Sequence, residues 1–262
     1  MNLLLAAISG WGKSYHAQGI MEESISDYSH FIVLDFCDEY RGLVKAGLAS
    51  HAIVGEVEAG LGVSGWMDVL EQNKKVVLAR VESMTVDEWR QVCADVIEAG
   101  RRLDDPLFAI DEAHFVAPQG EKCPKPITGL ATTGRGEGAS ALWITQRLST
   151  LEETVIAQCQ SRMLGGFNTD SDLNKIEDPL EYPVDAHNAG GHDVRGLPED
   201  LHADDEGGIS VRRWENGDGD TVGSEWLFSD DSGDMKRINT RGMDMQTTHY
   251  GSQGNPISLP TY

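Results

Sequence analysis

An apolar run near the start of the chain, NLLLAAI at residues 2–8, leads directly into the glycine-rich sequence SGWGKS. A short, continuous apolar run is typical of a strand that is buried on both faces of a parallel sheet. Backbone N–H groups can surround phosphate oxygens where Gly10 and Gly12 leave the backbone free to turn, and the helix expected from Lys13 points its N-terminus at the anion. The sequence therefore predicts a phosphate-binding loop between a buried strand and a helix.

The loop matches the P-loop pattern G-x-x-x-x-G-K-[ST], except that Ala7 stands where the pattern has glycine. Lys13 is expected to contact the β- and γ-phosphates of ATP, and the Ser14 hydroxyl to bind Mg²⁺. The indole of Trp11 could stack on a base or simply cover the loop, and the residues leave both possibilities open. The predicted nucleotide-binding residues are Ser9, Gly10, Trp11, Gly12, Lys13, Ser14 and Tyr15.

A second buried strand is expected at LFAID, residues 107–111, and it delivers two adjacent carboxylates, Asp111 and Glu112. Ligands bind at the carboxyl ends of the strands in open parallel sheets. This sequence looks like a Walker B motif, in which Asp111 would join the Mg²⁺ shell opposite Ser14 and Glu112 would polarise the attacking water. A capping pair at a strand end is the alternative, and the upstream P-loop argues against it. His114 is expected to support this site rather than to bind a metal.

A third polar position follows the apolar stretch ALWIT at residues 141–145, where Gln146 ends the expected strand. A neutral amide both donates and accepts hydrogen bonds, so it can sense a γ-phosphate or orient a water molecule. A glutamine after a strand is usually only solvated. Only the other two motifs make Gln146 a predicted catalytic residue beside Lys13 and Glu112.

The remaining chain alternates between strand-like and helix-like segments, which predicts an α/β fold with a mainly parallel central sheet and helices on both faces. A domain core is expected over residues 1–190, a C-terminal β-hairpin extension over 191–230, and a polar, flexible tail over 231–262. Within the core, further strands are expected at 31–36, from near Lys75 and at 163–167, and helices at 85–102, around 128–133 and at 151–160.

The charge balance is strongly acidic, with 43 Asp and Glu against 21 Lys and Arg and a net charge of −22. The acidic residues are dispersed and lysine is scarce, which favours a protein from a halophilic host over an ordinary acidic protein. The four cysteines form no C-x-x-C pair, and no apolar run approaches the roughly 20 residues of a membrane-spanning helix. We therefore expect a soluble protein in a reducing cytoplasm.

The three motifs occur in the order found in the FtsK/HerA superfamily of P-loop ATPases, which residues 2–168 resemble. The similarity includes VLDFCDEY at 33–40, AIDEAH at 109–114 and GRGEGASALWITQRLS at 134–149. It implies a RecA-like core, a hexameric ring with ATP at the subunit interfaces, and double-stranded DNA as the partner. It also implies an arginine that reaches the γ-phosphate of the neighbouring subunit, for which Arg135 is the candidate and Arg147 and Arg162 are rivals.

The P-loop begins seven residues from the first residue, so we expect a motor core without an added N-terminal domain. This is similar to the genome-packaging ATPases of icosahedral viruses with an internal membrane, here from a halophilic archaeal system, acting in the host cytoplasm and at a capsid vertex. A HerA-like cellular or plasmid motor for DNA repair or conjugation is the alternative. A P-loop nucleotide switch without translocation and an acidic structural protein with an inactive P-loop remain further readings. Lys122 and Lys125 could face DNA or be solvated.

Overall fold

A single mixed β-sheet organises the protein. The computed structural model describes residues 1–120 and 122–251. In this part of the chain the sheet has ten strands in the order β10-β9-β7-β1-β6-β5-β2-β4-β3, with β8 paired to β9 off this path. The strands are β1 Asn2–Ala6, β2 His30–Asp35, β3 Ser50–Val54, β4 Lys75–Arg80, β5 Pro106–Ile110, β6 Ser140–Thr145, β7 Ser161–Leu164, β8 Arg213–Glu215, β9 Thr221–Asp230 and β10 Met235–Asn239.

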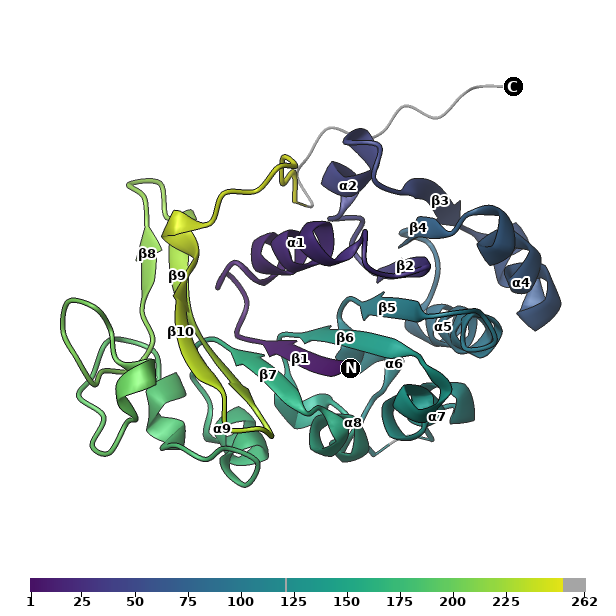
Figure 1. Ribbon diagram of the computed structural model, residues 1–262. Helices are drawn as coiled ribbons and strands as arrows, with labels where there is room; N and C mark the ends of the chain where they lie inside the picture. The colour runs from purple at the N-terminus through teal and green to yellow at the C-terminus, as the bar shows by residue number, and fades with distance from the viewer. Residues whose placement is uncertain (121, 252–262) are drawn as a thin grey trace.

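Seven of these strands, from β7 across to β3, pair in parallel, whereas β8, β9 and β10 are antiparallel to their neighbours. Figure 1 shows helices above and below the parallel part of the sheet. The predicted mainly parallel α/β fold is therefore confirmed. The helices are α1 Lys13–Ser24, α2 Arg41–Lys45, α3 Glu56–Ala59, α4 Gly62–Gln72, α5 Val86–Gly100, α6 Ala113–Val116, α7 Lys125–Thr132, α8 Glu153–Gln158 and α9 Asp170–Glu177.

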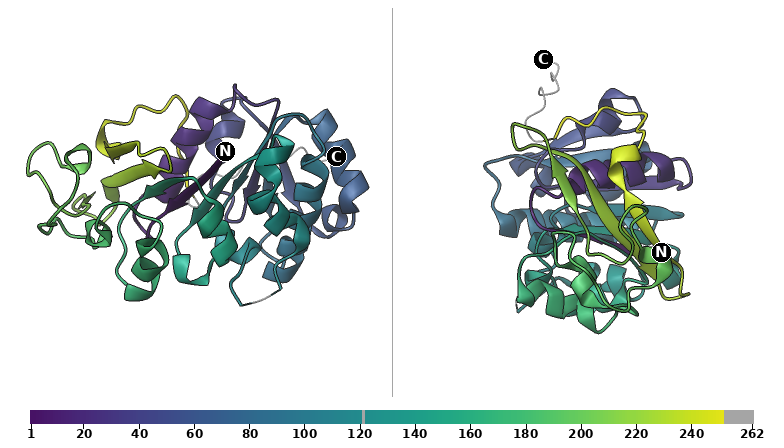
Figure 2. Two further views of the ribbon diagram at one scale, coloured as in Figure 1. Left: turned by 60° about the horizontal axis from the view of Figure 1, so that its bottom comes forward. Right: turned by 90° about the vertical axis from the view of Figure 1, so that its left-hand side faces the viewer.

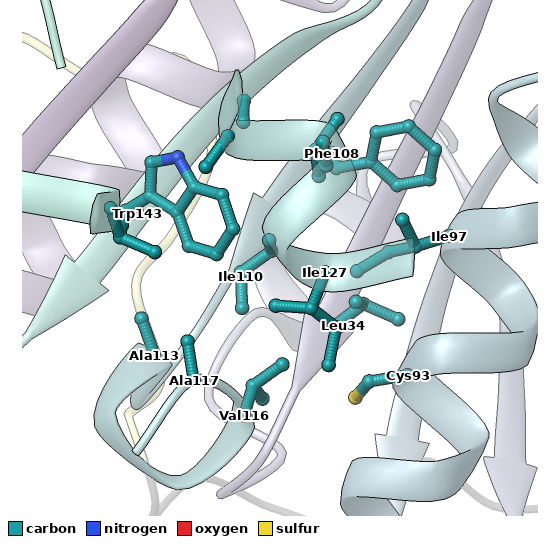
Figure 3. Close-up of a cluster of buried hydrophobic side chains, with 14 of the residues drawn as sticks. Leu34, Cys93, Ile97, Phe108, Ile110, Ala113, Val116, Ala117, Ile127 and Trp143 are labelled. Carbon is teal, nitrogen blue, oxygen red and sulfur yellow. The ribbon is translucent and has the colours of Figure 1, made fainter. Parts of the chain in front are cut away.

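The core has two layers because the strands are apolar on both faces. Leu3 and Leu5 of β1 pack with the side of the sheet that α1 and α2 cover, whereas Leu4 and Ala6 pack with the opposite side. The second layer lies under α4 to α9, and Figure 3 shows part of it, where Phe108 and Ile110 of β5 meet side chains from α5, α6 and α7. A strand that is buried on both faces has no polar alternation, which is why the sequence shows continuous apolar runs.

Most of the predicted elements form within a few residues of their expected limits. The predicted capping residue of α5 is confirmed, because the Thr85 side chain accepts from the backbone N–H of Glu88 and the Glu88 carboxylate accepts from the backbone N–H of Thr85. The prediction omitted β3, placing the third strand of the chain at Lys75. β3 is an edge strand whose residues from Ser50 to Ile53 are partly or fully exposed, so it lacks the apolar run that marked the others.

The C-terminal part differs from its expected form. β8 and β9 pair as antiparallel strands in the region where a hairpin was expected, and β9 continues into the main sheet, where it pairs with β7. Residues 231–251, expected as the start of a polar tail, include β10, which pairs with β9, and a segment that packs along α1. The polar sequence MKRIN is an edge strand and needs only one neighbour, so composition concealed it. Residues 252–262 of the expected tail lie outside the described residues.

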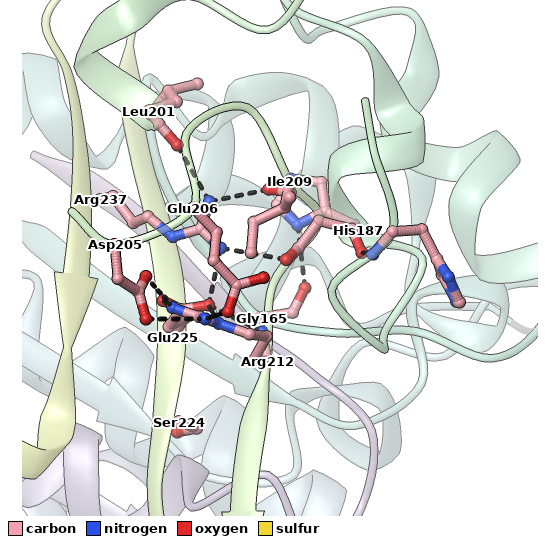
Figure 4. Close-up of polar contacts among 12 residues, drawn as sticks. Gly165, His187, Leu201, Asp205, Glu206, Ile209, Arg212, Ser224, Glu225 and Arg237 are labelled. Atoms are coloured by element: carbon pink, nitrogen blue, oxygen red, sulfur yellow. Dashed lines mark hydrogen bonds and ion pairs between the residues drawn. The ribbon is translucent and has the colours of Figure 1, made fainter. Parts of the chain in front are cut away.

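A buried ionic cluster ties the C-terminal strands to the loops before them (Figure 4). The Glu225 carboxylate on β9 accepts from Arg212 at 2.9 Å and from Arg237 on β10 at 2.6 Å. Arg237 also donates to the backbone carbonyls of Leu201, Ile209 and Ser210. The two views of Figure 2 show these strands and loops standing at one end of the molecule, beside α1. None of the helices in residues 1–120 and 122–251 is both long and apolar enough to cross a membrane.

Candidate active site

The predicted phosphate loop has the backbone geometry that an anion site requires. Gly10 and Gly12 have φ angles of +73° and +83°, in the left-handed region that favours glycine, and Gly12 is the N-cap of α1. Among the described residues, no backbone acceptor contacts the N–H groups of Gly12, Lys13 and Ser14. These unpaired groups at a helix N-terminus are donors that a phosphate can use.

Lys13 lies at this N-terminus, and the residue is 9% exposed. Burial lowers its pKa, while the nearby carboxylates of Glu112, Asp111 and Glu39 oppose the shift. A buried lysine beside free amides is suited to receive a polyanion, because a phosphate would supply the negative charge that desolvation makes costly to leave unpaired.

Ser14 is held by a residue that the sequence interpretation did not assign. Its hydroxyl donates to the Glu39 carboxylate in a short hydrogen bond. Glu39 is positioned in turn by Asp35 at the end of β2, whose carboxylate accepts from the backbone N–H groups of Glu39 at 3.1 Å and Tyr40 at 3.0 Å. Burial raises the pKa of Asp35 to about 7. A cation at Ser14 would therefore have Glu39 within its immediate surroundings.

Asp111 has an unsatisfied oxygen that fits a cation. The residue is 4% exposed. Its Oδ1 accepts from the Tyr40 hydroxyl at 3.4 Å, and its Oδ2 has no hydrogen-bond partner within the described chain. Burial raises the pKa of Asp111 well above its ordinary value, and the neighbouring carboxylates add to this effect. In the described ranges no three His, Cys, Asp or Glu side chains converge as a metal site. Mg²⁺ commonly uses one or two protein oxygens with phosphate and water, which is the set that Ser14, Asp111 and a nucleotide would provide.

Glu112 and Gln146 meet, as the sequence interpretation required. Gln146 Nε2 donates to Glu112 Oε1 at 2.9 Å, and the backbone of Glu112 is in the left-handed region at φ +45°. Burial raises the pKa of Glu112. A carboxylate that is partly desolvated and held by a neutral amide is suited to accept a proton from water. A non-glycine residue in this conformation is maintained only when its surroundings hold it there.

The His114 ring lies beside the Glu112 carboxylate. Its Nδ1 lies 3.2 Å from Glu112 Oε2 and 3.1 Å from the Thr145 hydroxyl at the end of β6. Burial lowers the pKa of His114 to about 4, so the imidazole is neutral near pH 7. The ring lies next to the carboxylate that would act on water, and the supporting role of His114 stays a prediction.

The three candidate arginines lie in different places. Arg135 is exposed on the turn Gly134–Glu137, near the N-terminal amine of Met1 at the amino edge of the sheet, away from the phosphate loop of its own chain. Arg147 is exposed at the carboxyl edge, close enough to Glu112 to lower its pKa. Arg162 is buried and pairs with Asp231 at 3.0 Å, so it is not available to a neighbouring subunit.

The Trp11 side chain covers the loop rather than facing the cleft. It is 2% exposed, and its Nε1 donates to the Glu225 carbonyl at 3.1 Å. A Cβ at Gly165 would lie 2.5 Å from the indole, so glycine at the end of β7 is what allows this packing. Of the two possibilities for Trp11, stacking on a base is excluded for this conformation, and only its backbone could contact a nucleotide.

Most of the predicted nucleotide-binding residues, with Glu112 and Gln146, line one cleft of about 940 Å³, which is large enough for a nucleotide, whereas Asp111 and Trp11 do not. One wall is formed by the C-terminal strands, which the sequence interpretation did not connect with the site. A hairpin was expected there, but no local signal places it against a loop two hundred residues earlier. The cleft is lined by Ser9, Gly10, Gly12, Lys13, Ser14, Tyr15, Glu39, Glu112, Gln146, Arg213, Glu215, Gly219, Asp220, Thr221, Val222, Gly223, Ser224, Thr240, Arg241 and His249.

Comparison with solved structures supports the same assignment of the fold. The genome packaging NTPase B204 from Sulfolobus turreted icosahedral virus 2, in complex with ATP-γS, superimposes with a TM-score of 0.57 over 90% of this chain and 95% of that chain, at 15% identity. The chain has a RecA-like P-loop NTPase fold. VirB4 of Thermoanaerobacter pseudethanolicus gives a TM-score of 0.54 over 90% of this chain and 88% of its own, at 10% identity. At these identities the two comparisons support the fold alone.

In sequence, no protein-family model matches the chain. A probable helicase of Methanocaldococcus jannaschii is 25% identical over 115 residues, which are 42% of this chain. The match spans only 22% of the length of that helicase, so it concerns a part of the larger protein.

Proposed function

We propose that this protein hydrolyses ATP with Mg²⁺ and uses the energy to move double-stranded DNA, as a viral genome-packaging motor. The observation that carries the proposal is the convergence of five predicted residues at one edge of the sheet. Lys13, Ser14, Glu112 and Gln146 line the same cleft, and Asp111 lies immediately behind it. The structural likeness to a packaging NTPase that was solved with ATP-γS supports the same assignment.

Each residue has a chemical part in hydrolysis. The amides of the phosphate loop and Lys13 bind the triphosphate, and Ser14 and Asp111 would hold Mg²⁺, which neutralises the charge that develops on the phosphates. Glu112 accepts the proton of the attacking water, and Gln146 orients Glu112 through the 2.9 Å hydrogen bond. This division of roles follows from the two adjacent carboxylates, of which one faces the cation and the other the amide.

The assembly that we propose is a homo-oligomeric ring, a hexamer by resemblance. Arg135 is exposed at the amino edge of the sheet and cannot serve the cleft of its own chain. In a ring, the amino edge of one subunit could face the cleft of the next, where Arg135 would stabilise the charge on the γ-phosphate. Arg147, at the carboxyl edge beside Glu112, is the remaining rival.

An ATPase assay with and without duplex DNA tests the proposal. We expect wild-type turnover that DNA stimulates, and we expect Lys13→Ala to abolish nucleotide binding and turnover. Lys175→Ala is the matched control, because Lys175 lies on α9 and pairs with Glu153. Unchanged hydrolysis by Lys13→Ala would refute the site. ATP turnover that DNA does not stimulate would refute the proposed motor function and favour a nucleotide switch.

A cellular or plasmid DNA-processing ATPase is the second candidate. The likeness to VirB4 and the local match to a probable helicase favour it. Both candidates require DNA-stimulated hydrolysis, so the partner separates them. A packaging motor, acting in the host cytoplasm, is expected to bind a capsid vertex and to fill empty capsids with DNA when ATP is added. DNA translocation on free duplex without any capsid partner would favour the second candidate.

A further inference from the structure

Two side chains of the β8–β9 hairpin donate hydrogen bonds to one carbonyl group of the phosphate loop, that of Gly10. Arg213 Nη1 on β8 donates to the Gly10 carbonyl at 3.0 Å, and the Thr221 hydroxyl on β9 donates to the same oxygen at 2.5 Å. The two donors lie 203 and 211 residues from Gly10 in the sequence. Figure 1 shows β8 and β9 standing beside the turn that joins β1 to α1.

This carbonyl belongs to a glycine, whose backbone can take more conformations than that of any other residue. Gly10 has φ +73°, and a glycine populates both signs of φ readily. A change in the Gly10 backbone would shift the loop and with it the N–H groups of Gly12, Lys13 and Ser14, which have no backbone acceptor among the described residues and are the donors for a phosphate. Two hydrogen bonds to the Gly10 carbonyl oppose such a change, because both would break.

The donors are themselves fixed. Arg213 also pairs with Glu215 through a short ion pair, and its guanidinium lies 5.8 Å from the centre of the Trp11 ring. The Asn216 N–H donates to the Asp220 carbonyl at 2.9 Å and closes the hairpin between the two strands. The hairpin base is held through Glu225, whose carboxylate accepts from Arg212 and Arg237. The contact with Gly10 is therefore made by a hairpin that other hydrogen bonds and ion pairs hold in place.

We propose that Arg213 and Thr221 are positioning residues for nucleotide binding, which hold Gly10 in the loop conformation that leaves the amides of Gly12, Lys13 and Ser14 free for the phosphates. The inference rests on the proposed function and assigns the C-terminal hairpin a part in it. Because the loop amides serve every nucleotide with a β-phosphate, losing these bonds weakens ADP and ATP equally.

The test measures ADP and ATP affinity of the full-length protein by calorimetry. Thr221→Val removes the hydroxyl with little change in volume and no change in charge, and Arg213→Met removes the guanidinium. We expect each to raise the Kd of ADP and ATP alike by about three- to tenfold, the size of one hydrogen bond. The double variant should lose more than the product of the two, because the remaining donor no longer compensates. Arg195→Met, an exposed arginine outside the cleft, is the matched control.

Kinetics and stability separate positioning from other roles. We expect the KM for ATP to rise in step with the Kd and kcat to change less, with Arg213→Lys recovering part of the loss. Weaker binding of ATP alone would mean that Arg213 contacts the γ-phosphate and would overturn the proposal. Unchanged affinity with a lower melting temperature would also overturn it, by showing a purely structural contact. If Lys13→Ala abolishes binding while both hairpin variants bind normally, the hairpin inference fails and the ATPase proposal stands.

Discussion

At the scale of single residues, Glu112 is the site residue whose conformation its surroundings constrain most. Its backbone is in the left-handed region, its carboxylate accepts from Gln146, and His114 lies 3.2 Å away on the other side. A residue so constrained has little freedom, which is an advantage for a base that must meet one water molecule. Because the side chain is held in one position, a substitution of similar shape at Glu112 can test the effect of its charge alone.

Glu112→Gln is expected to lower kcat by about 10²- to 10⁴-fold, because the amide cannot accept the proton of the attacking water. ATP affinity should stay within a few-fold of wild type, since Glu112 is not among the groups that bind the phosphates. Single-turnover hydrolysis and ATP binding, measured on the same preparation, check this. The isosteric Gln146→Glu serves as a comparison, because it keeps the size of the contact but places two carboxylates together. Hydrolysis near the wild-type rate in Glu112→Gln would remove Glu112 from the mechanism.

At the scale of elements, the C-terminal strands are joined to the core by buried ionic and aromatic contacts. Arg237 on β10 and Glu225 on β9 are 6% and 3% exposed in their side chains. His16 on α1 is 3% exposed and packs edge-on against Trp226 of β9, with ring centres 4.8 Å apart. These contacts fix the wall of the cleft to the helix that begins at the phosphate loop.

Arg237→Met is expected to lower the free energy of unfolding by about 3–5 kcal/mol, because it leaves a buried carboxylate with one partner fewer and strips three carbonyls of their donor. Urea unfolding measures this loss. Adding Glu225→Gln should recover part of it, since the buried charge that lost one of its two arginine partners is then removed. A loss below about 1 kcal/mol, the size of a surface ion pair, would contradict the structural role of the cluster.

The pH dependence of stability should report on His16. Burial lowers the pKa of His16 to about 4, below the 6.5 of an exposed imidazole. A depressed pKa favours the folded protein above pH 6.5, and this stabilisation is lost as the pH falls toward 4. His16→Phe keeps an aromatic ring against Trp226 and removes the titration, so its melting temperature should fall less than that of wild type over this interval. His192→Gln, an exposed site, is the control. Parallel pH profiles for His16→Phe and wild type would contradict the prediction.

At the scale of the whole molecule, the net charge of −22 dominates the electrostatics. Self-repulsion on this scale destabilises the compact state, and salt screens it, with a Debye length of about 3 Å at 1 M. We propose a protein that works in concentrated salt. The melting temperature should therefore rise between about 0.1 and 2 M KCl, and DNA-stimulated hydrolysis should persist at the upper limit. A melting temperature that is independent of KCl would contradict the halophilic interpretation.

The parts of the fold that could be predicted from sequence are those that local residues decide. Three segments of the sequence show an apolar run that ends in polar side chains. They are the strand and turn at 2–14, the strand at 107–110 with the carboxylates after it, and the strand at 141–145 with the amide after it. Because the carboxyl ends of parallel strands lie at one edge of a sheet, their convergence was also predictable. For this reason Lys13, Glu112 and Gln146 meet as expected.

Only the tertiary structure decided which strands lie at the edges of the sheet and which distant segments contact each other. β3 and β10 lie at the edges, where a strand is stabilised by backbone pairing with one neighbour and needs no continuous apolar sequence. The bonds from Arg213 and Thr221 to Gly10 join residues more than two hundred positions apart, and no periodicity records such a pairing. Local sequence thus determined the chemistry at the strand ends, whereas packing of the whole chain determined which C-terminal wall closes over it.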